Sequence, residues 1–237
     1  MTATVGIMAY ADTRNKKIVL ASDSQLNEVD EADTILSRTV DFNKIAYGSY
    51  WAMSFSGTFN KQISGFFRLI KHKSNEPLVE KAVKEKSFQE VIELNRKICR
   101  LSGLDNVAEF LLATIKPEIG LYFVDSFGNV LETPVGDEEN SDYIALGSGK
   151  KFIKNFLEGS IGNRAIDQEG ITPGLAVRLA YDSIDKNDDP GTGGPIELFM
   201  LGEDGIKNYG ERLRKAQKKA LKDELEAIMN ELGPKIS

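Results

Sequence analysis

The second residue of the chain, Thr2, has the residue type and the position of a possible nucleophile. A threonine hydroxyl attacks a carbonyl carbon only after a base takes its proton, and a free α-amine with a pKa of about 8 can be that base. Because the residue after Met1 is small, we expect an aminopeptidase to remove Met1 and leave Thr2 with a free α-amine. A Met-Thr start is common among proteins, so other residues must support this chemistry.

Two short motifs suggest ligand binding but are better explained by local structure. Residues 147–150 read Gly-Ser-Gly-Lys, but they lack the Gly at the start and the Ser or Thr at the end of a phosphate-binding loop. Residues 185–189 resemble the start of a calcium loop, but Pro190 replaces its central Gly and Ile196 its final Glu. We interpret the first motif as a strand-to-helix turn and the second as a solvated acidic helix end.

The sequence contains one histidine and one cysteine, which restricts its metal and redox chemistry. His72 alone cannot build a multi-histidine zinc site, and its place beside two lysines at a predicted helix end favours a surface residue. Cys99 alone excludes an intramolecular disulfide and is compatible with a reducing compartment. We interpret Cys99 as a core residue, and we expect neither a metal nor a cofactor.

Length and composition suit a globular chain with one large domain or two small ones. The 237 residues are 41% hydrophobic and 28% charged, values that exclude disordered, collagen-like and coiled-coil classes. The net charge of −6 gives no general attraction to nucleic acid or anionic membranes. The N-terminus does not have the pattern of a signal peptide, and no apolar run approaches the roughly 18 residues of a membrane span. We therefore expect a cytoplasmic protein without a nucleic-acid or membrane partner.

A scaffold of strands and helices in alternating blocks must position these residues. Runs rich in β-branched residues predict strands at residues 5–10, 17–21, 44–47, 52–56, 110–115, 120–124, 129–133, 143–146, 195–201 and 206–209. Helical spacing of apolar residues predicts helices from Phe59 through Ile70, from Ser87 to Gly103, through Phe152 and Leu157, from Thr172, and over residues 211–232. The polar and acidic stretch 27–41 predicts a long loop.

The order of these elements favours an α+β fold over a doubly wound sheet, because runs of strands alternate with pairs of helices. Two helix pairs could cover the outer faces of two stacked sheets. We find no linker, so residues 1–210 are predicted to form one domain and residues 211–237 a C-terminal helical extension. The apolar stripe along residues 211–232 predicts a helix that faces a partner subunit.

An ordered series of motifs resembles proteasome β-type subunits. These motifs are TATVGI at 2–7, VLASDS at 19–24, NKI at 43–45, SFSG at 54–57, IALGSG at 144–149, DPGTGG at 189–194 and GEDG at 202–205. The resemblance includes the HslV-like and Anbu-like members of the N-terminal-nucleophile (Ntn) hydrolase superfamily. It implies a four-layer α-β-β-α sandwich over residues 1–210, which agrees with the predicted order of elements.

The resemblance also implies a set of catalytic residues, each matched by its place in a motif. The set is Thr2, Asp23, Lys44, Gly57, Ser148, Asp189 and Thr192. Thr2 matches the nucleophile, Asp23 the aspartate of the first strand pair and Lys44 the buried lysine. Gly57 matches the glycine whose backbone N–H helps to bind the oxyanion, and the other three match a supporting polar shell. A lysine near Thr2 would favour proton loss from its neighbours, and N–H donors would stabilise a tetrahedral intermediate.

The resemblance thus implies a threonine-type endopeptidase in which Thr2 forms an ester with the substrate and water releases it. It implies peptide or unfolded-protein substrates and self-association into a ring or an open helical array, and it leaves the need for an ATPase partner open. Two alternatives stay open: a catalytically inactive scaffold subunit, and an amide-bond ligase in which an amine replaces water. Retention of Met1 would favour the scaffold, and a peptide panel would separate protease from ligase.

Overall fold

The computed structural model describes residues 3–9, 15–29, 35–39, 42–57, 61–99, 108–131, 142–162, 170–189, 192–216 and 220–232. In this part of the chain, seven α-helices accompany two five-stranded antiparallel sheets and one two-stranded sheet. The predicted α+β class is confirmed. The predicted element ends at Tyr10, Phe59, Gly103 and Thr133 lie outside these ranges.

Both large sheets are antiparallel, and the first joins strands from the two ends of the sequence. Its order is β10 (Tyr143–Gly147), β1 (Ala3–Ala9), β2 (Lys17–Ser22), β11 (Glu197–Gly202) and β12 (Gly205–Asn208). The second has the order β5 (Ile45–Tyr47), β6 (Trp51–Gly57), β7 (Ala108–Thr114), β8 (Gly120–Val124) and β9 (Val130–Leu131). Strand β2 therefore lies between the N-terminal strand β1 and the late strand β11.

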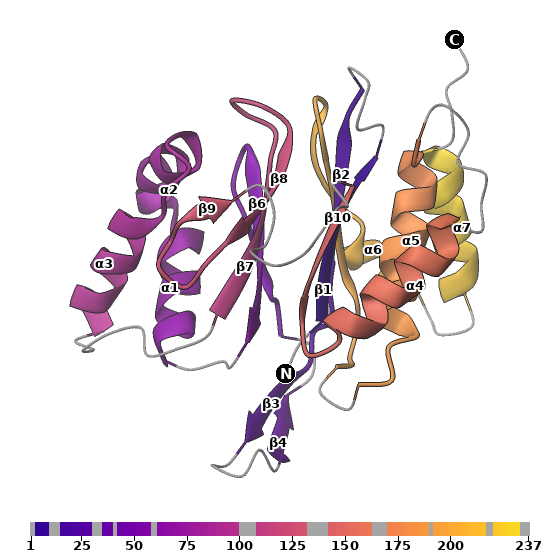
Figure 1. Cartoon of the computed structure of the whole chain (residues 1–237), viewed down its shortest axis with the longest axis horizontal. Helices are drawn as coiled ribbons and strands as arrows, with labels where there is room; N and C mark the ends of the chain where they lie inside the picture. Colours follow the sequence, from indigo (N-terminus) through magenta and orange to yellow (C-terminus); the bar gives the residue numbers. More distant parts are fainter. Residues whose placement is uncertain are drawn as a thin grey trace.

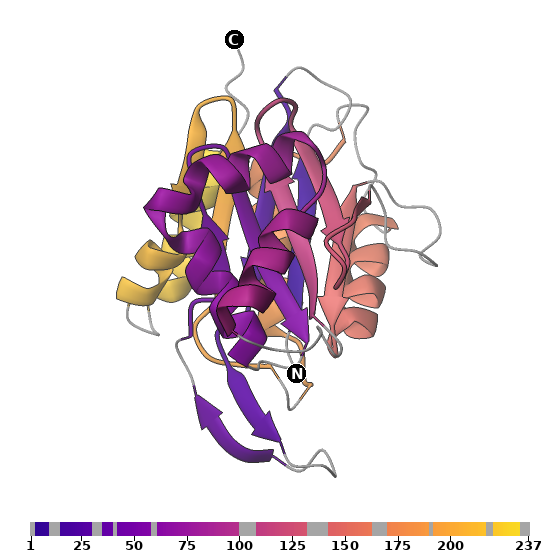
Figure 2. The same cartoon turned by 90° about the vertical axis from the view of Figure 1, so that its left-hand side faces the viewer.

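Helices cover the outer face of each sheet, and the two sheets face each other (Figure 1). The second sheet is covered by α1 (Lys61–Lys71), α2 (Glu76–Lys84) and α3 (Gln89–Cys99), with a 3-10 turn at Lys73–Asn75 (Figure 2). The first sheet is covered by α4 (Lys150–Gly162), α5 (Pro173–Asp185) and α6 (Gly210–Lys215), and α7 (Leu221–Glu231) packs on α5 on the same side. The layers thus follow the order helices, sheet, sheet, helices.

Alternation along the strands gives each sheet two buried faces. On β2, Ile18 and Leu20 belong to the apolar core between the sheets, whereas Val19 and Ala21 belong to the core beneath the helices. This period of two is the geometry of a strand buried on both faces. A Cβ at Gly6 would lie 2.6 Å from Leu121 Cδ1, so glycine there allows β1 and β8 to approach closely.

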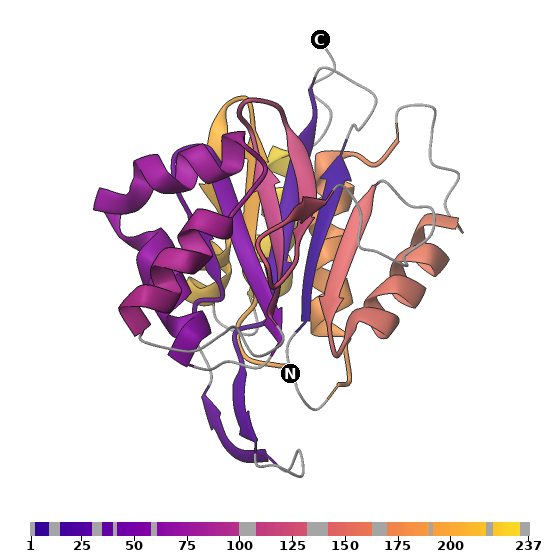
Figure 3. The ribbon, with the colours of Figure 1, turned by 60° about the vertical axis from the view of Figure 1, so that its left-hand side comes forward.

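The prediction of a long loop at residues 27–41 is wrong. Strand β3 (Leu26–Val29) pairs with β4 (Ile35–Thr39) in a hairpin that extends beyond the ends of the two sheets (Figure 3). The prediction gave more weight to the acidic residues between the strands than to the β-branched residues Val29, Ile35 and Thr39, which favour extended backbone.

Helix α2 is absent from the prediction, which has only two helices in this region. Glu76 and Pro77 lie in the first turn of α2, where an acidic side chain and a proline both suit a helix start. Val79, Ala82 and Val83 form its buried face. The segment has a helix-start signal and an apolar face, but it is too short for the periodicity to stand out.

The C-terminal segment is also different from its prediction as one helix over residues 211–232. Helix α6 ends at Lys215, Ala216 has extended backbone with φ −69° and ψ 130°, and α7 begins at Leu221. Leu213, Leu225 and Ile228 are buried in the core shared with α5. The stripe predicted to face a partner subunit therefore packs against its own chain, because the break between α6 and α7 lets α6 pack on β11 and α7 pack on α5. No helix in the described ranges is long and apolar enough to cross a membrane.

Candidate active site

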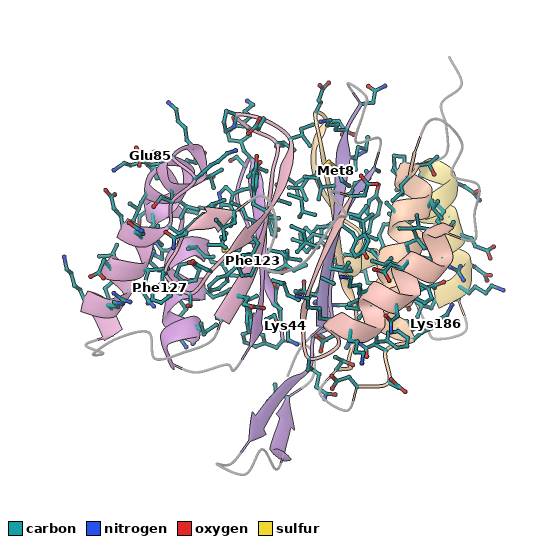
Figure 4. The ribbon with its side chains drawn as sticks, in the orientation of Figure 1. Met8, Lys44, Glu85, Phe123, Phe127 and Lys186 are labelled. Carbon is teal, nitrogen blue, oxygen red and sulfur yellow. The ribbon has the colours of Figure 1, made fainter. Side chains whose placement is uncertain are left out.

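A buried ion pair joins the two sheets at the end near the β3–β4 hairpin, where Figure 4 labels Lys44. Asp23 directly follows β2 of the first sheet, and Lys44 directly precedes β5 of the second. Both residues are 0% exposed, and Lys44 Nζ lies 2.8 Å from Asp23 Oδ1. Charges this deeply buried are rare unless they are paired, so the pair is a candidate for function.

The Asp23 carboxylate accepts four hydrogen bonds, three of them from backbone N–H groups. Oδ1 accepts from Ala3 N at 2.9 Å and from Lys44 Nζ at 2.8 Å. Oδ2 accepts from Gln25 N and Gly193 N, each at 3.2 Å. A carboxylate has about four acceptor positions, so Asp23 is saturated. The start of β1, the end of β2 and the loop before β11 therefore meet at one side chain.

Burial perturbs both members of the pair. Burial raises the pKa of the Asp23 carboxyl, and the charge of Lys44 and the N–H groups of Ala3 and Gly193 oppose that rise. Burial lowers the pKa of the Lys44 ammonium, and the negative charges of Asp23 and Glu197 oppose that fall. A lysine with a lowered pKa gives up its proton more readily than one in water.

Glu197, which the sequence analysis does not identify, fixes the main chain of Lys44. It begins β11, is 2% exposed, and its Oε2 accepts from Lys44 N at 2.7 Å and from Ile45 N at 3.1 Å. Its Oε1 accepts from Arg214 Nη2 of α6 at 2.8 Å. An acidic residue at the start of an otherwise apolar strand is the sequence signal that would have indicated a buried carboxylate in need of partners.

A pair of buried hydroxyl groups forms a second bridge between the sheets. Thr4 Oγ1 of β1 donates to Ala21 O at 2.9 Å and lies 2.7 Å from Ser54 Oγ of β6. Because a hydroxyl has a single proton, Ser54 is the donor to Thr4. The bridge lies one residue along β1 from the amide of Ala3 that binds Asp23, and it holds the sheets together beside the ion pair.

The loop that contains Asp189 and Thr192 reaches Asp23 through its backbone. Thr192 N and Oγ1 both donate to Asp189 O at 2.9 Å, which binds these two residues to each other. Gly193 follows Thr192 and donates to Asp23, and Ser24 N donates to Gly193 O at 3.2 Å. The two predicted residues thus shape the loop that supplies an N–H to the ion pair.

Ser24 and Gly194 pack closely at the base of this loop. A Cβ at Gly194, whose φ is +75°, would lie 2.6 Å from Ser24 Oγ. The Ser24 side chain is fully buried, and its Oγ has no hydrogen-bond partner among the described residues. The position of the Ser24 side chain therefore requires a residue without a Cβ at position 194.

Ser148 lies in the turn after β10, beside the start of β1. Gly147, with φ +98°, pairs with Ala3, and Ser148 itself is exposed. A Cβ at Gly149 would lie 1.9 Å from Asn187 Nδ2 and 3.2 Å from Ala3 Cβ. The turn is therefore packed against Ala3 and against the chain that follows α5.

Gly57 is the last residue of β6 and has φ +124°. Because Ile45 pairs with Ser54, Gly57 lies at the end of β6 that is next to Lys44. The structure thus gathers six predicted residues, Asp23, Lys44, Gly57, Ser148, Asp189 and Thr192, at one end of the two sheets, and the hydrogen bonds given above join Asp23 directly to Lys44. Thr2, the predicted nucleophile, lies outside the described residues.

The other candidates of the sequence do not join this cluster. His72 is exposed, as predicted, and its Nδ1 lies 2.7 Å from Ser74 Oγ. The side chain of Cys99 lies outside the described part of the chain. The described residues contain no group of three or more His, Cys, Asp or Glu that could hold a metal ion.

Comparison of the sequence with known protein families and with characterised proteins finds no match to either.

Proposed function

We propose that this chain is a threonine-type endopeptidase with the four-layer α-β-β-α sandwich of the N-terminal-nucleophile hydrolases. In this proposal Met1 is removed in the cytoplasm and Thr2 is the nucleophile. The order of layers and the resemblance of the motifs support the fold assignment. The substrates would be peptides or unfolded proteins.

One observation carries the proposal: the start of β1 is bound to the buried ion pair. Ala3 N lies 2.9 Å from Asp23 Oδ1, and the same oxygen is 2.8 Å from Lys44 Nζ. A peptide bond joins Thr2 to Ala3 N. The proposed nucleophile is therefore the residue directly before the amide that binds the Asp23–Lys44 ion pair. A stabilising role alone does not require a buried lysine at this place, since apolar residues of similar volume often stabilise as well as a buried ion pair.

In the proposed reaction the α-amine of Thr2 accepts the hydroxyl proton, and the oxygen forms a bond to the substrate carbonyl carbon. The substrate C–N bond breaks, the proton passes to the leaving amine, and an ester on Thr2 remains. Water then hydrolyses the ester and restores the hydroxyl. The positive charge of Lys44 lowers the pKa of a nearby α-amine, which keeps that amine unprotonated and able to accept the proton.

Intact-mass spectrometry with a peptide β-lactone tests the proposal. Attack by the Thr2 hydroxyl opens the lactone, the ring C–O bond breaks, and the chain gains the full mass of the reagent. We expect the purified chain to lack Met1 and to gain one adduct at residue 2. Thr2→Ser, which keeps the hydroxyl, should also react, whereas Thr2→Ala should not, and Lys44→Ala should lose most of the rate.

Two results would contradict the proposal. A chain isolated from its native cell that retains Met1 in every molecule would exclude the α-amine as the base. Labelling of Thr2→Ala at the rate of the unchanged chain would place the nucleophile elsewhere. A panel of peptides with and without added amines then distinguishes hydrolysis from ligation by the mass of the product.

We also propose, from the resemblance alone, that copies of the chain self-associate into a ring or an open helical array. Assembly of this kind would enclose residue 2 and restrict access to short or unfolded chains. Mass photometry of the mature protein tests it, and a monomer at micromolar concentration that cleaves peptides would contradict it.

A further inference from the structure

Helix α6 is connected to the buried lysine through a single carboxylate. Arg214 Nη2 donates to Glu197 Oε1 at 2.8 Å, and Glu197 Oε2 accepts from Lys44 N at 2.7 Å and from Ile45 N at 3.1 Å. The three residues come from α6, from the start of β11 and from the start of β5. A continuous path of hydrogen bonds therefore runs from the C-terminal helices to the residue that pairs with Asp23.

This path fixes the point from which the Lys44 side chain leaves the backbone. One oxygen that binds two consecutive N–H groups restrains the peptide plane between them. A lysine side chain has large rotamer freedom, so the position of its ammonium depends on the backbone at one end and on its partner at the other. Glu197 restrains the first end, and Asp23 restrains the second.

Glu197 needs Arg214 to hold this position. Burial raises the pKa of the Glu197 carboxyl, and Arg214, the N–H groups of Ile45 and Lys44, and Lys71 of α1 oppose that rise. A buried carboxylate without a counter-charge would take up a proton or turn toward solvent. The charged groups that act on Lys44 are Asp23 and Glu197, and those that act on Glu197 are Arg214 and Lys71.

We infer that Glu197 and Arg214 are positioning residues, which hold the main chain of Lys44 so that its ammonium is fixed in the proposed active site. Helix α6 is then part of the scaffold of that site. The predicted boundary at residue 210 separates α6 from the domain that it supports. The catalytic consequence of this inference rests on the proposed function, whereas the hold on the Lys44 backbone does not.

Helix α6 provides a matched control, because Arg212 also forms ion pairs. Arg212 Nε lies 2.7 Å from Glu224 Oε1 of α7, and neither residue contacts Glu197 in the described interactions. Arg214→Met and Arg212→Met each remove one guanidinium from the same helix and keep most of the side-chain volume. Both break an ion pair, but only Arg214→Met breaks the path to Lys44.

The first measurement is hydrogen–deuterium exchange of the Lys44 and Ile45 amides in the full chain. We expect exchange about tenfold faster in Arg214→Met, as for the loss of a charge-assisted hydrogen bond, and within about twofold of the unchanged chain in Arg212→Met. Equal exchange at both amides in the two variants would overturn the inference. If Arg214→Met does not fold, Glu197→Gln replaces it, since the amide oxygen remains an acceptor but lacks the charge.

The second measurement is the pH dependence of β-lactone acylation. Glu197→Gln removes a negative charge near Lys44 and should move the limb that reports Lys44 to lower pH. Arg214→Met leaves the buried Glu197 carboxylate without its counter-charge, so Glu197 takes up a proton or turns away and the same limb should also move to lower pH, whereas Arg212→Met should not move it. A structural role alone would lower the rate in both variants without a shift of this limb, and that result would overturn the positioning role.

The two measurements separate the inference from the proposed function. If exchange is faster in Arg214→Met but the unchanged chain is not acylated, the proposed function is rejected and the restraint of the Lys44 backbone by Glu197 and Arg214 stands. Normal acylation of the unchanged chain with unchanged exchange in Arg214→Met would keep the function and reject the inference.

Discussion

Removal of either charge of the Asp23–Lys44 pair should destabilise the fold by different amounts. In Lys44→Met, Asp23 keeps three backbone N–H donors, from Ala3, Gln25 and Gly193. Breaking a buried pair costs 3–5 kcal/mol, and the remaining donors place this variant near the lower value, about 3 kcal/mol. In Asp23→Asn the ammonium of Lys44 loses its counter-ion, and the new NH₂ group faces N–H donors, so we expect about 4–5 kcal/mol.

The double variant distinguishes a coupled pair from two independent residues. Asp23→Asn with Lys44→Met removes both charges, so no unpaired charge remains buried. The single costs add to about 7–8 kcal/mol, but we expect about 4–5 kcal/mol for the double variant, a coupling of about 3 kcal/mol. Because the volume of a methionine side chain is similar to that of the lysine stem, Lys44→Met loses little packing.

Urea unfolding followed by far-ultraviolet circular dichroism at pH 7 measures these free energies. The slope of the free energy against urea must agree among the four proteins, because a changed slope would indicate a changed unfolded or folded state. Costs that add in the double variant would refute the argument that the two charges stabilise each other. A larger cost for Lys44→Met than for Asp23→Asn would refute the argument from the three N–H donors.

Three further predictions concern single positions. Ser24→Ala should leave the free energy of unfolding unchanged or raise it by up to about 1 kcal/mol, because the hydroxyl is buried with no hydrogen-bond partner among the described residues; a loss of that size in urea unfolding would contradict this. Burial, aided by neighbouring carboxylates, raises the pKa of Tyr181 to about 12, so its contribution to stability is complete below pH 10 and is lost as the pH rises toward 12. Absorbance titration should show this late tyrosine, and Tyr181→Phe should abolish that part of the alkaline destabilisation. Gly194→Ala should cost about 1–3 kcal/mol because φ is +75° and the added Cβ would lie 2.6 Å from Ser24 Oγ. In α4, Gly159→Ala should stabilise by up to about 1 kcal/mol in the same assay, because apart from the adjacent residues and the helix's own backbone no described atom lies within 4 Å of the added Cβ.

Local patterns predict most strands and the longer helices of this chain. Strand β2 has a continuous apolar run between polar residues, β6 is mostly apolar with serines at alternate positions, and α1 has a clear apolar face, so each is visible within its own segment. Helix α2 and the β3–β4 hairpin are short and lie in polar surroundings, where composition masks the signal. The break at Ala216 depends on how α6 packs on β11 and α7 packs on α5, which the periodicity of one segment does not contain.

In the candidate site, too, local motifs indicate some residues, whereas their binding partners lie far away in the sequence. Asp23 and Lys44 lie in short motifs beside predicted strands, so the local sequence is enough to indicate both residues. Glu197 binds the backbone of Lys44 across 153 positions of the sequence, and Gly193 binds Asp23 across 170. The identity of such partners depends on the strand order of the folded chain, which the local pattern of each segment does not reveal.

The position of β2 between β1 and β11 limits how far the chain can fold during its synthesis on the ribosome. The strands that carry Asp23 are made early, but their neighbour β11 and the N–H of Gly193 emerge later by roughly 10 to 35 seconds at ordinary rates of synthesis. Until then β2 has an open edge, which is a site for aggregation and for chaperone binding. A nascent chain therefore cannot complete the surroundings of Asp23 before translation has passed Glu197, and any chemistry at this site begins only when nearly the whole protein has been made.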